Sequence, residues 1–237
     1  GSSSAYGNYA TAFGKSSSAY GNNAVASGDY SSAYGFYAEA TGNSSSAYGE
    51  NVKATGNSSS AYGRGAIASG GYSSAYGFAA EATGDSSSAY GEDVKATGHV
   101  SSAYGSNAQA MGVFSSAYGA GALASADKSI AIGSGFEINP DTGEVKQTAA
   151  TGERAAAIGY MAQATAVDAL ALGSGAQATV AYGVALGAMS VADRMTTAAG
   201  VYVPTGADAG GVSATVKGSN YGVVSIGSGS FTRQLAG

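Results

Sequence analysis

The sequence of 237 residues contains no cysteine, only two prolines and very little charge. Without cysteine the chain can form neither disulfide bonds nor thiolate sites. Charged residues make up 11%, and the net charge of −5 is opposite in sign to the basic surfaces that bind nucleic acid. No apolar run reaches the length of a membrane span, and no signal peptide opens the sequence. We therefore expect no nucleic acid partner, and no membrane segment within this sequence.

The residues that carry catalysis are also scarce. His99 is the single histidine; it lies at an expected turn, where a solvated side chain is the ordinary outcome and a zinc site would need several more ligands. The many serines have no partnered base, so no Ser-His-Asp set is visible. The Gly-Ser-Gly strings at 133–135, 173–175 and 227–229 lack the lysine and the following helix of a phosphate-binding loop. The sequence thus predicts no metal, no cofactor and no enzymatic activity.

What the sequence does have is a strict repeat. Ser-Ser-Ala-Tyr-Gly occurs nine times between residues 3 and 119, always 14 residues apart. Each unit is two heptads that usually end in glycine, which indicates a turn every seven residues and a short strand of about five residues between turns. Repeats of this kind build solenoids. We therefore predict an all-β parallel roll of 14-residue coils, in which about thirteen coils at about 4.8 Å give a height of about 60 Å.

Side-chain alternation sorts each heptad by face. The third and fifth residues are Ser, Ala or Val throughout and are predicted to point into the coil. In the second heptads the fourth and sixth residues vary, so this strand is predicted to face water. Glu39 and Lys53 share an equivalent position in adjacent coils, as do Glu81 and Lys95; we expect surface ion pairs, with a receptor site as the alternative.

The outward residues of the first heptads behave differently, because they stay aromatic or aliphatic along the whole column. A core of Ala and Ser buries little apolar surface against the cost of ordering the backbone. We therefore predict that this stripe is buried against further copies of the same chain; the alternative is an exposed aromatic ladder for a ligand. The predicted interface residues are Tyr6, Tyr20, Tyr34, Tyr48, Tyr62, Tyr76, Tyr90, Tyr104, Tyr118, Ile130, Ile132, Ile158, Leu170, Leu172, Val184 and Leu186.

The rhythm is interrupted twice. We predict a β-hairpin insertion at about 134–153, because strand-like pieces flank a Pro-Asp-Thr-Gly turn within 136–147. A small β-rich insertion is predicted at 194–222, before a last strand in 223–237. The 42-residue blocks 22–63 and 64–105 also match each other, which indicates duplication of three coils. Candidate receptor contacts on the hairpin are Glu137, Asn139, Asp141, Glu144 and Lys146.

Several strings carry a family resemblance: "DKSIAIGSG", "AAAIGYMAQATA", "DALALGSGAQATV" and "YGVALG". With the 14-residue rhythm they resemble the head domain of trimeric autotransporter adhesins of the YadA type, over residues 1–193 without the hairpin. "SVADR" (190–194) resembles the head-closing sequence, and "SIGSGSFTRQ" (225–234) resembles the start of the neck. Nine coils have Tyr where the family usually has Ile or Val, so we make no prediction of collagen binding.

The resemblance implies a left-handed parallel β-roll assembled as a homotrimer. It also implies a bacterial cell-surface location, in which a stalk and a C-terminal outer-membrane anchor outside this sequence carry the head. We accordingly expect a piece of a longer protein. The implied function is non-catalytic attachment to host cells or extracellular matrix. Two alternatives remain open: a passive spacer that holds another adhesive domain away from the surface, and an ice-binding solenoid, which the mixed outer residues disfavour.

Overall fold

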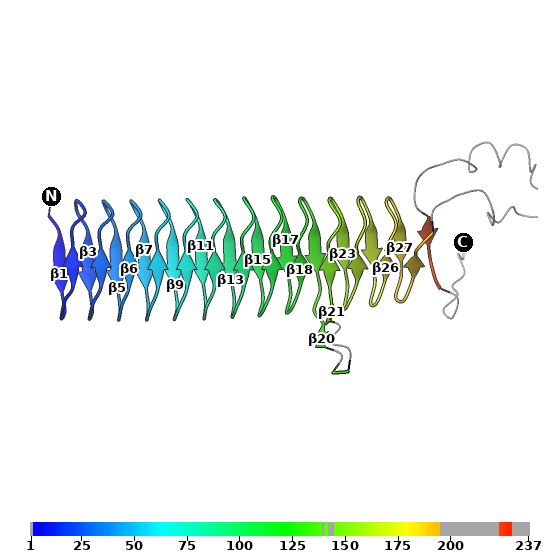
Figure 1. The fold of residues 1–237 in the computed structure, drawn as a ribbon, viewed down its shortest axis with the longest axis horizontal. Coiled ribbons are helices and arrows are strands. Elements are labelled where there is room, and N and C mark those ends of the chain that lie inside the picture. The colour runs from blue at the N-terminus through cyan, green and yellow to red at the C-terminus, as the bar shows by residue number, and fades with distance from the viewer. Residues whose placement is uncertain (1, 139, 142–144, 195–222, 229–237) are drawn as a thin grey trace, which may run out of the picture.

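A computed structural model describes residues 2–138, 140–141, 145–194 and 223–228. These residues form a long roll whose coils are stacked along one axis, with β1 at one end and β27 and β29 at the other (Figure 1). Within this part of the chain there is no helix long and apolar enough to span a membrane. The predicted insertion at 194–222 lies outside the described residues except for Arg194, and 229–237 of the predicted neck start lie outside them as well.

In the described residues, two parallel sheets run the length of the roll, and a two-stranded antiparallel sheet projects from it. We name the 14-stranded sheet, built from the first heptads, the tyrosine sheet, and the 13-stranded sheet, built from the second heptads, the variable sheet. The tyrosine sheet contains β1 (Ser4–Tyr6), β3 (Ser18–Tyr20), β5 (Ser32–Tyr34), β7 (Ser46–Tyr48), β9 (Ser60–Tyr62), β11 (Ser74–Tyr76), β13 (Ser88–Tyr90), β15 (Ser102–Tyr104), β17 (Ser116–Tyr118), β19 (Ile130–Ile132), β23 (Ala156–Ile158), β25 (Leu170–Leu172), β27 (Val184–Leu186) and β29 (Val224–Ser225). The variable sheet contains β2 (Thr11–Ala12), β4 (Val25–Ala26), β6 (Glu39–Ala40), β8 (Lys53–Ala54), β10 (Ile67–Ala68), β12 (Glu81–Ala82), β14 (Lys95–Ala96), β16 (Gln109–Ala110), β18 (Leu123–Ala124), β22 (Ala149–Ala150), β24 (Gln163–Ala164), β26 (Gln177–Ala178) and β28 (Val191–Ala192).

The strands are shorter than the five residues predicted. Those of the tyrosine sheet have three residues, except β29 with two, and those of the variable sheet have two. The turns take up the difference. From Tyr9 to Met189 the second residue of the heptads adopts a left-handed conformation, except at Gln147, with φ between +49° and +60° where it is not glycine, as at Tyr37 and Ala79. The glycines that end the first heptads have φ between +104° and +152°, which only glycine adopts readily. Each heptad is therefore half strand and half turn.

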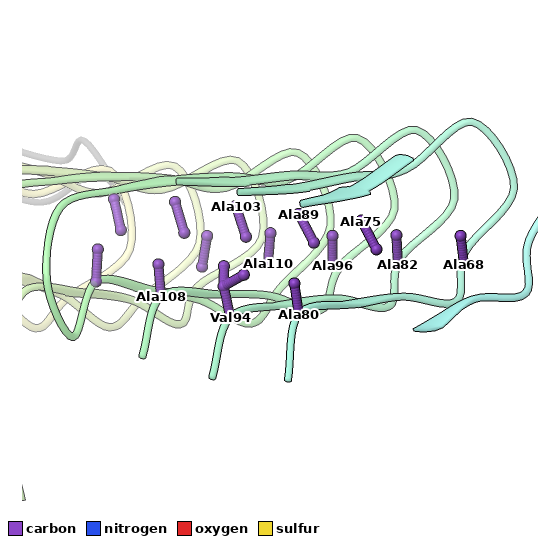
Figure 2. Close-up of a cluster of buried hydrophobic side chains, with 14 of the residues drawn as sticks. Ala68, Ala75, Ala80, Ala82, Ala89, Val94, Ala96, Ala103, Ala108 and Ala110 are labelled. Carbon is purple, nitrogen blue, oxygen red and sulfur yellow. The ribbon is translucent and has the colours of Figure 1, made fainter. Parts of the chain in front are cut away.

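The interior is filled by small side chains, as the alternation predicts. Third and fifth residues such as Ser31, Ala33, Ala38 and Ala40 are fully buried. Figure 2 shows the equivalent alanines of later coils, such as Ala75 and Ala82, together with Val94, pointing from the two sheets into the narrow space between them. Interiors this thin hold few methylene groups per residue, so the close approach of the two backbones depends on alanine and serine.

The antiparallel sheet lies where the hairpin was predicted and pairs β20 (Phe136–Ile138) with β21 (Val145–Gln147). The partners Ile130 and Ala156, on either side of it, are 26 positions apart instead of 14, so 26 − 14 = 12 residues are inserted. The roll resumes at Thr148, earlier than the predicted boundary near 153, because β22 already pairs with β18 and β24. After the second interruption, β29 returns to the tyrosine sheet and pairs with β27.

Candidate functional site

The outward side chains of the tyrosine sheet include one continuous aromatic and aliphatic stripe, which comprises the sixteen predicted interface residues and is flanked by outward serines in the first nine coils. Each tyrosine lies directly above the next in the strand register, as Tyr62 does with Tyr76. From Tyr6 to Tyr118 the successive rings are stacked, with centroids 4.7–5.5 Å apart and interplanar angles of 9° or less. The spacing of parallel strands, about 4.8 Å, sets this distance. The structure therefore brings the nine tyrosines together as a flat aromatic ladder.

Stacking covers most of each ring face but leaves the ring edges open. Tyr6, at the end of the ladder, is 69% exposed, whereas the rings from Tyr20 to Tyr104 are half-buried by their neighbours. Burial, followed by the negative charge that Tyr76 and Tyr48 would carry when ionised, raises the pKa of Tyr62 above 10.0, and a hydrogen bond with Ser46 opposes the rise. The pKa of Tyr90 is raised in the same way. The ladder thus favours neutral phenols.

Beyond Tyr118 the stripe continues in aliphatic side chains. Ile132 pairs in register with Tyr118 and Ile158, and Leu172 with Ile158 and Leu186. In the single chain about 40% of the surface of Ile130, Ile132, Leu172 and Leu186 is exposed. Contiguous apolar surface of this length is typical of interaction sites. The placement of the sixteen residues on one face agrees with the sequence pattern, and their role at a subunit interface stays a prediction.

The hairpin carries three of the five candidate receptor contacts within the described residues. Glu137 and Lys146 lie opposite each other in the strand pair, and Asp141 lies in the connecting turn. The Tyr160 hydroxyl donates a hydrogen bond to Glu137, and this bond, together with the negative charge of Glu137, raises the pKa of Tyr160. Asn139 and Glu144 lie outside the described residues. The hairpin also exposes an apolar face that sequence reasoning missed, formed by Phe136, Ile138 and Val145.

The predicted surface ion pairs are confirmed. Lys53 Nζ lies 3.0 Å from Glu39, and Lys95 Nζ lies 3.2 Å from Glu81, each pair between adjacent coils of the variable sheet. All four side chains are partly solvated, so each pair contributes well under 1 kcal/mol to folding. Arg154 forms a further pair with Asp168, also one coil apart, in which two guanidinium nitrogens contact both carboxylate oxygens.

A second set of contacts between coils was not predicted. These bonds lie at the turns that precede first heptads. The side-chain oxygen of Asp29 accepts a hydrogen bond from the backbone N–H of Lys15, one coil earlier. Asn43 receives the same bond from Asp29, and Asp85 from Gly71. The recurrence of Asp and Asn at this heptad position is the signal that could have identified these bonds, because short polar side chains satisfy turn backbone.

The described residues hold no set of three or more His, Cys, Asp or Glu side chains that could bind a metal ion. His99 lies edge-on to Phe114 at a turn, 6.0 Å between ring centroids, in agreement with the ordinary role predicted for it. The surface of the roll therefore offers aromatic, aliphatic and paired charged groups, and these are suited to recognition by contact.

The YadA head domain repeat model matches residues 5–31, 14–38, 26–51, 110–135, 150–176 and 164–190. Among solved structures, the collagen-binding domain of the Yersinia adhesin YadA is 24% identical and covers 84% of this chain and 74% of its own, with a TM-score of 0.35. No curated protein matches the sequence.

The matched segments all lie in the roll, on both sides of the hairpin, and their 14-residue coils are those that the sequence predicted. The matched segments of the chain are YadA head domain repeats, which are non-catalytic adhesin modules. The assignment rests on the repeats.

Proposed function

We propose that this chain is the head of a trimeric adhesin on a bacterial surface and attaches the bacterium to host cells or extracellular matrix. The observation that carries the proposal is the match of the coils to YadA head domain repeats. Three left-handed rolls would pack their stripes around a common axis, and a stalk and outer-membrane anchor outside this sequence would carry the head. The exposed aliphatic residues around Ile132 and Leu172 support this packing, because contiguous aliphatic side chains are typical of interfaces and not of surfaces that stay in water.

Sedimentation tests the assembly. Ile132→Asp would place a carboxylate in the middle of the stripe, and we expect the trimer to dissociate because a charge buried without a partner is costly. Ile67→Asp is the matched control, because Ile67 is an aliphatic residue on the variable sheet. A monomeric parent protein, or equal behaviour of both variants, would contradict the trimer.

Attachment of beads coated with the purified protein to cultured cells and to a panel of matrix proteins tests the adhesive role. The hairpin residues Glu137, Asp141 and Lys146 are proposed receptor contacts, together with Asn139 and Glu144. A deletion of 134–145 removes four of the five and restores the 14-residue spacing, and exchange of Lys146 for Glu in that variant removes the last. Unchanged attachment by this variant would eliminate the hairpin as the contact surface.

A passive spacer is the second candidate, and the duplication of 22–63 as 64–105 favours it, because repeated coils add length without new chemistry. Beads that carry the purified head distinguish the two roles. A spacer attaches to nothing by itself, whereas an adhesive head binds cells or matrix in the absence of any other domain.

A further inference from the structure

The two duplicated blocks differ at nine positions, and a group of these lies beside the ion pair that both blocks have kept. In the first block a groove of about 270 Å³ is lined by Asn23, Val25, Tyr37, Glu39, Asn51 and Lys53. Three of these residues come from successive strands of the variable sheet, and the other three are the left-handed turn residues of the same coils. The groove is therefore bounded by two rows of side chains that run along the roll.

The ring of Tyr37 is held in place at this groove. It is 50% exposed, and Phe36 packs against it edge-to-face, with ring centroids 4.4 Å apart. The left-handed backbone of Tyr37 (φ +52°) is fastened to the preceding coil, because its N–H donates to the carbonyl of Asn22. A rigid, half-solvated aromatic ring of this kind costs little entropy when it binds a ligand.

The polar groups around the ring form a mixed set of donors and acceptors. Glu39 offers a carboxylate and Lys53 an ammonium group, 3.0 Å apart, and Asn23 and Asn51 add two amides. Because the charges of the ion pair compensate, the groove has no net preference for a charged ligand. An acceptor beside a donor matches two adjacent hydroxyl groups, and an aromatic ring matches the C–H face of a pyranose.

We infer that this groove binds a neutral sugar ring at the end of a host glycan, with the pyranose stacked on Tyr37 and its hydroxyls bonded to Glu39, Lys53 and the two amides. The inference deepens the proposed adhesin function and depends on it for its biological meaning. The equivalent positions of the second block are occupied by Gly65, Ile67, Ala79, Glu81, Asp93 and Lys95. This set keeps the ion pair but lacks the ring and both amides, so it binds no sugar.

The chain supplies its own controls. Tyr37→Ala gives position 37 the residue found at position 79, where the same left-handed conformation (φ +49°) is adopted, so the fold is preserved. Tyr72→Ala makes the same change at an exposed tyrosine of the opposite turn. The triple variant Gly65→Asn/Ala79→Tyr/Asp93→Asn builds the first groove into the second block, where Phe78 already occupies the place of Phe36.

The test is binding of the purified, fluorescently labelled full chain to an array of immobilised oligosaccharides with neutral, sialylated or sulfated ends, with proline-rich peptides on the same array. We expect signal on neutral ends, a loss of about tenfold or more in affinity in Tyr37→Ala, no change in Tyr72→Ala, and stronger binding by the triple variant through a second site per chain.

Binding to peptides alone, binding only to charged glycans, or equal binding by Tyr37→Ala and the parent would overturn the inference. So would the absence of any signal on the array. Because the array contains no cells, its failure leaves the proposed adhesin function standing if the coated beads still attach to cells, and the two failures are thereby distinguished.

Discussion

At the level of single residues, two kinds of glycine serve different purposes. Gly77 combines φ of +138° with a close approach, since a Cβ there would lie 2.0 Å from the carbonyl oxygen of Gly91 in the next coil. Gly84 does not need a positive φ, but its Cβ would lie 2.1 Å from the oxygen of Gly98. A Cβ at Gly65, in contrast, would lie 3.9 Å from its nearest neighbour, the Cα of Ala79, which is an ordinary van der Waals contact. The stacked backbone thus requires glycine at the heptad ends and merely permits it at the left-handed positions.

Gly77→Ala is expected to destabilise the roll by about 3 kcal/mol or more, because it adds both backbone strain and a clash with the next coil. Gly65→Asn is the matched control and is expected to change the free energy of unfolding by less than about 1 kcal/mol, since Asn51 and Asn107 occupy the same turn position with φ near +55°. Thermal unfolding followed by circular dichroism measures both. Equal melting temperatures for the two variants would contradict the argument.

At the level of the strands, the tyrosine ladder links stability to pH. The pKa values of Tyr62 and Tyr90 are raised above 10.0 by burial and by their tyrosine neighbours. The folded chain therefore retains these phenol protons at a pH where the unfolded chain has lost them. The stability contributed by the neutral ladder is fully present below pH 10.0 and is lost as the pH rises through the raised values.

We expect the melting temperature to fall steeply above pH 10, as tyrosinate charges accumulate about 4.8 Å apart along the ladder. Replacement of Tyr62, Tyr76 and Tyr90 by Phe keeps the ring stack and is expected to weaken this fall. The control replaces Tyr30 and Tyr72, two exposed turn residues, by Phe and is expected to leave the pH dependence unchanged. Equal pH profiles for the two sets of variants would refute the role of the ladder.

Thr148 is the residue through which the hairpin joins the roll. It takes an interior position that is alanine or valine in the first nine coils, and it is fully buried. Its hydroxyl donates toward the carbonyl oxygens of Gly159 (2.8 Å) and Ser134 (3.0 Å), and it accepts a hydrogen bond from the N–H of Met161. The hydroxyl thus satisfies backbone groups at the base of the hairpin.

Thr148→Ala is expected to lower the free energy of unfolding by about 1–3 kcal/mol, because it leaves the buried N–H and carbonyl groups without this partner. Urea denaturation of the variant and the parent measures the difference. In a background in which residues 134–145 are deleted the regular turn returns, and the same substitution should cost less than about 1 kcal/mol. A loss of equal size in both backgrounds would show that the hydroxyl has no special relation to the hairpin.

At the level of the whole molecule, the roll is a stack in which each coil contacts only its neighbours. Its stability is therefore close to a sum over coils and the interfaces between them. Deletion of 64–105 removes three coils and joins Gly63 to Ser106 in the same heptad register. Tyr118 then lies 14 positions after Tyr62 and can stack on it in the next coil.

We expect this shortened chain to fold with the same circular dichroism spectrum and to be shorter by about 14 Å, three strand spacings. Small-angle scattering measures the length. The oligomeric state should not change, because both the tyrosine and the aliphatic parts of the stripe remain. A misfolded or aggregated product would contradict the independence of the coils.

Much of this architecture follows from the sequence alone. The 14-residue period, the inward Ser and Ala, the stripe from Tyr6 to Leu186 and the Glu39–Lys53 pair can all be derived because strand alternation and a fixed repeat are local properties of the chain. The strand lengths could not be derived, since the left-handed turn position is occupied by residues as different as Tyr37, Ala79 and Val100.

Other features were decided by the tertiary structure, because they depend on contacts between residues one or more coils apart. The hydrogen bonds from one coil to Asp29 and Asp85 in the next exist only when the turns are stacked. The return to the roll at Thr148 depends on backbone groups of two other turns. The groove beside Tyr37 forms because three coils place a ring, an ion pair and two amides side by side, which no single repeat contains.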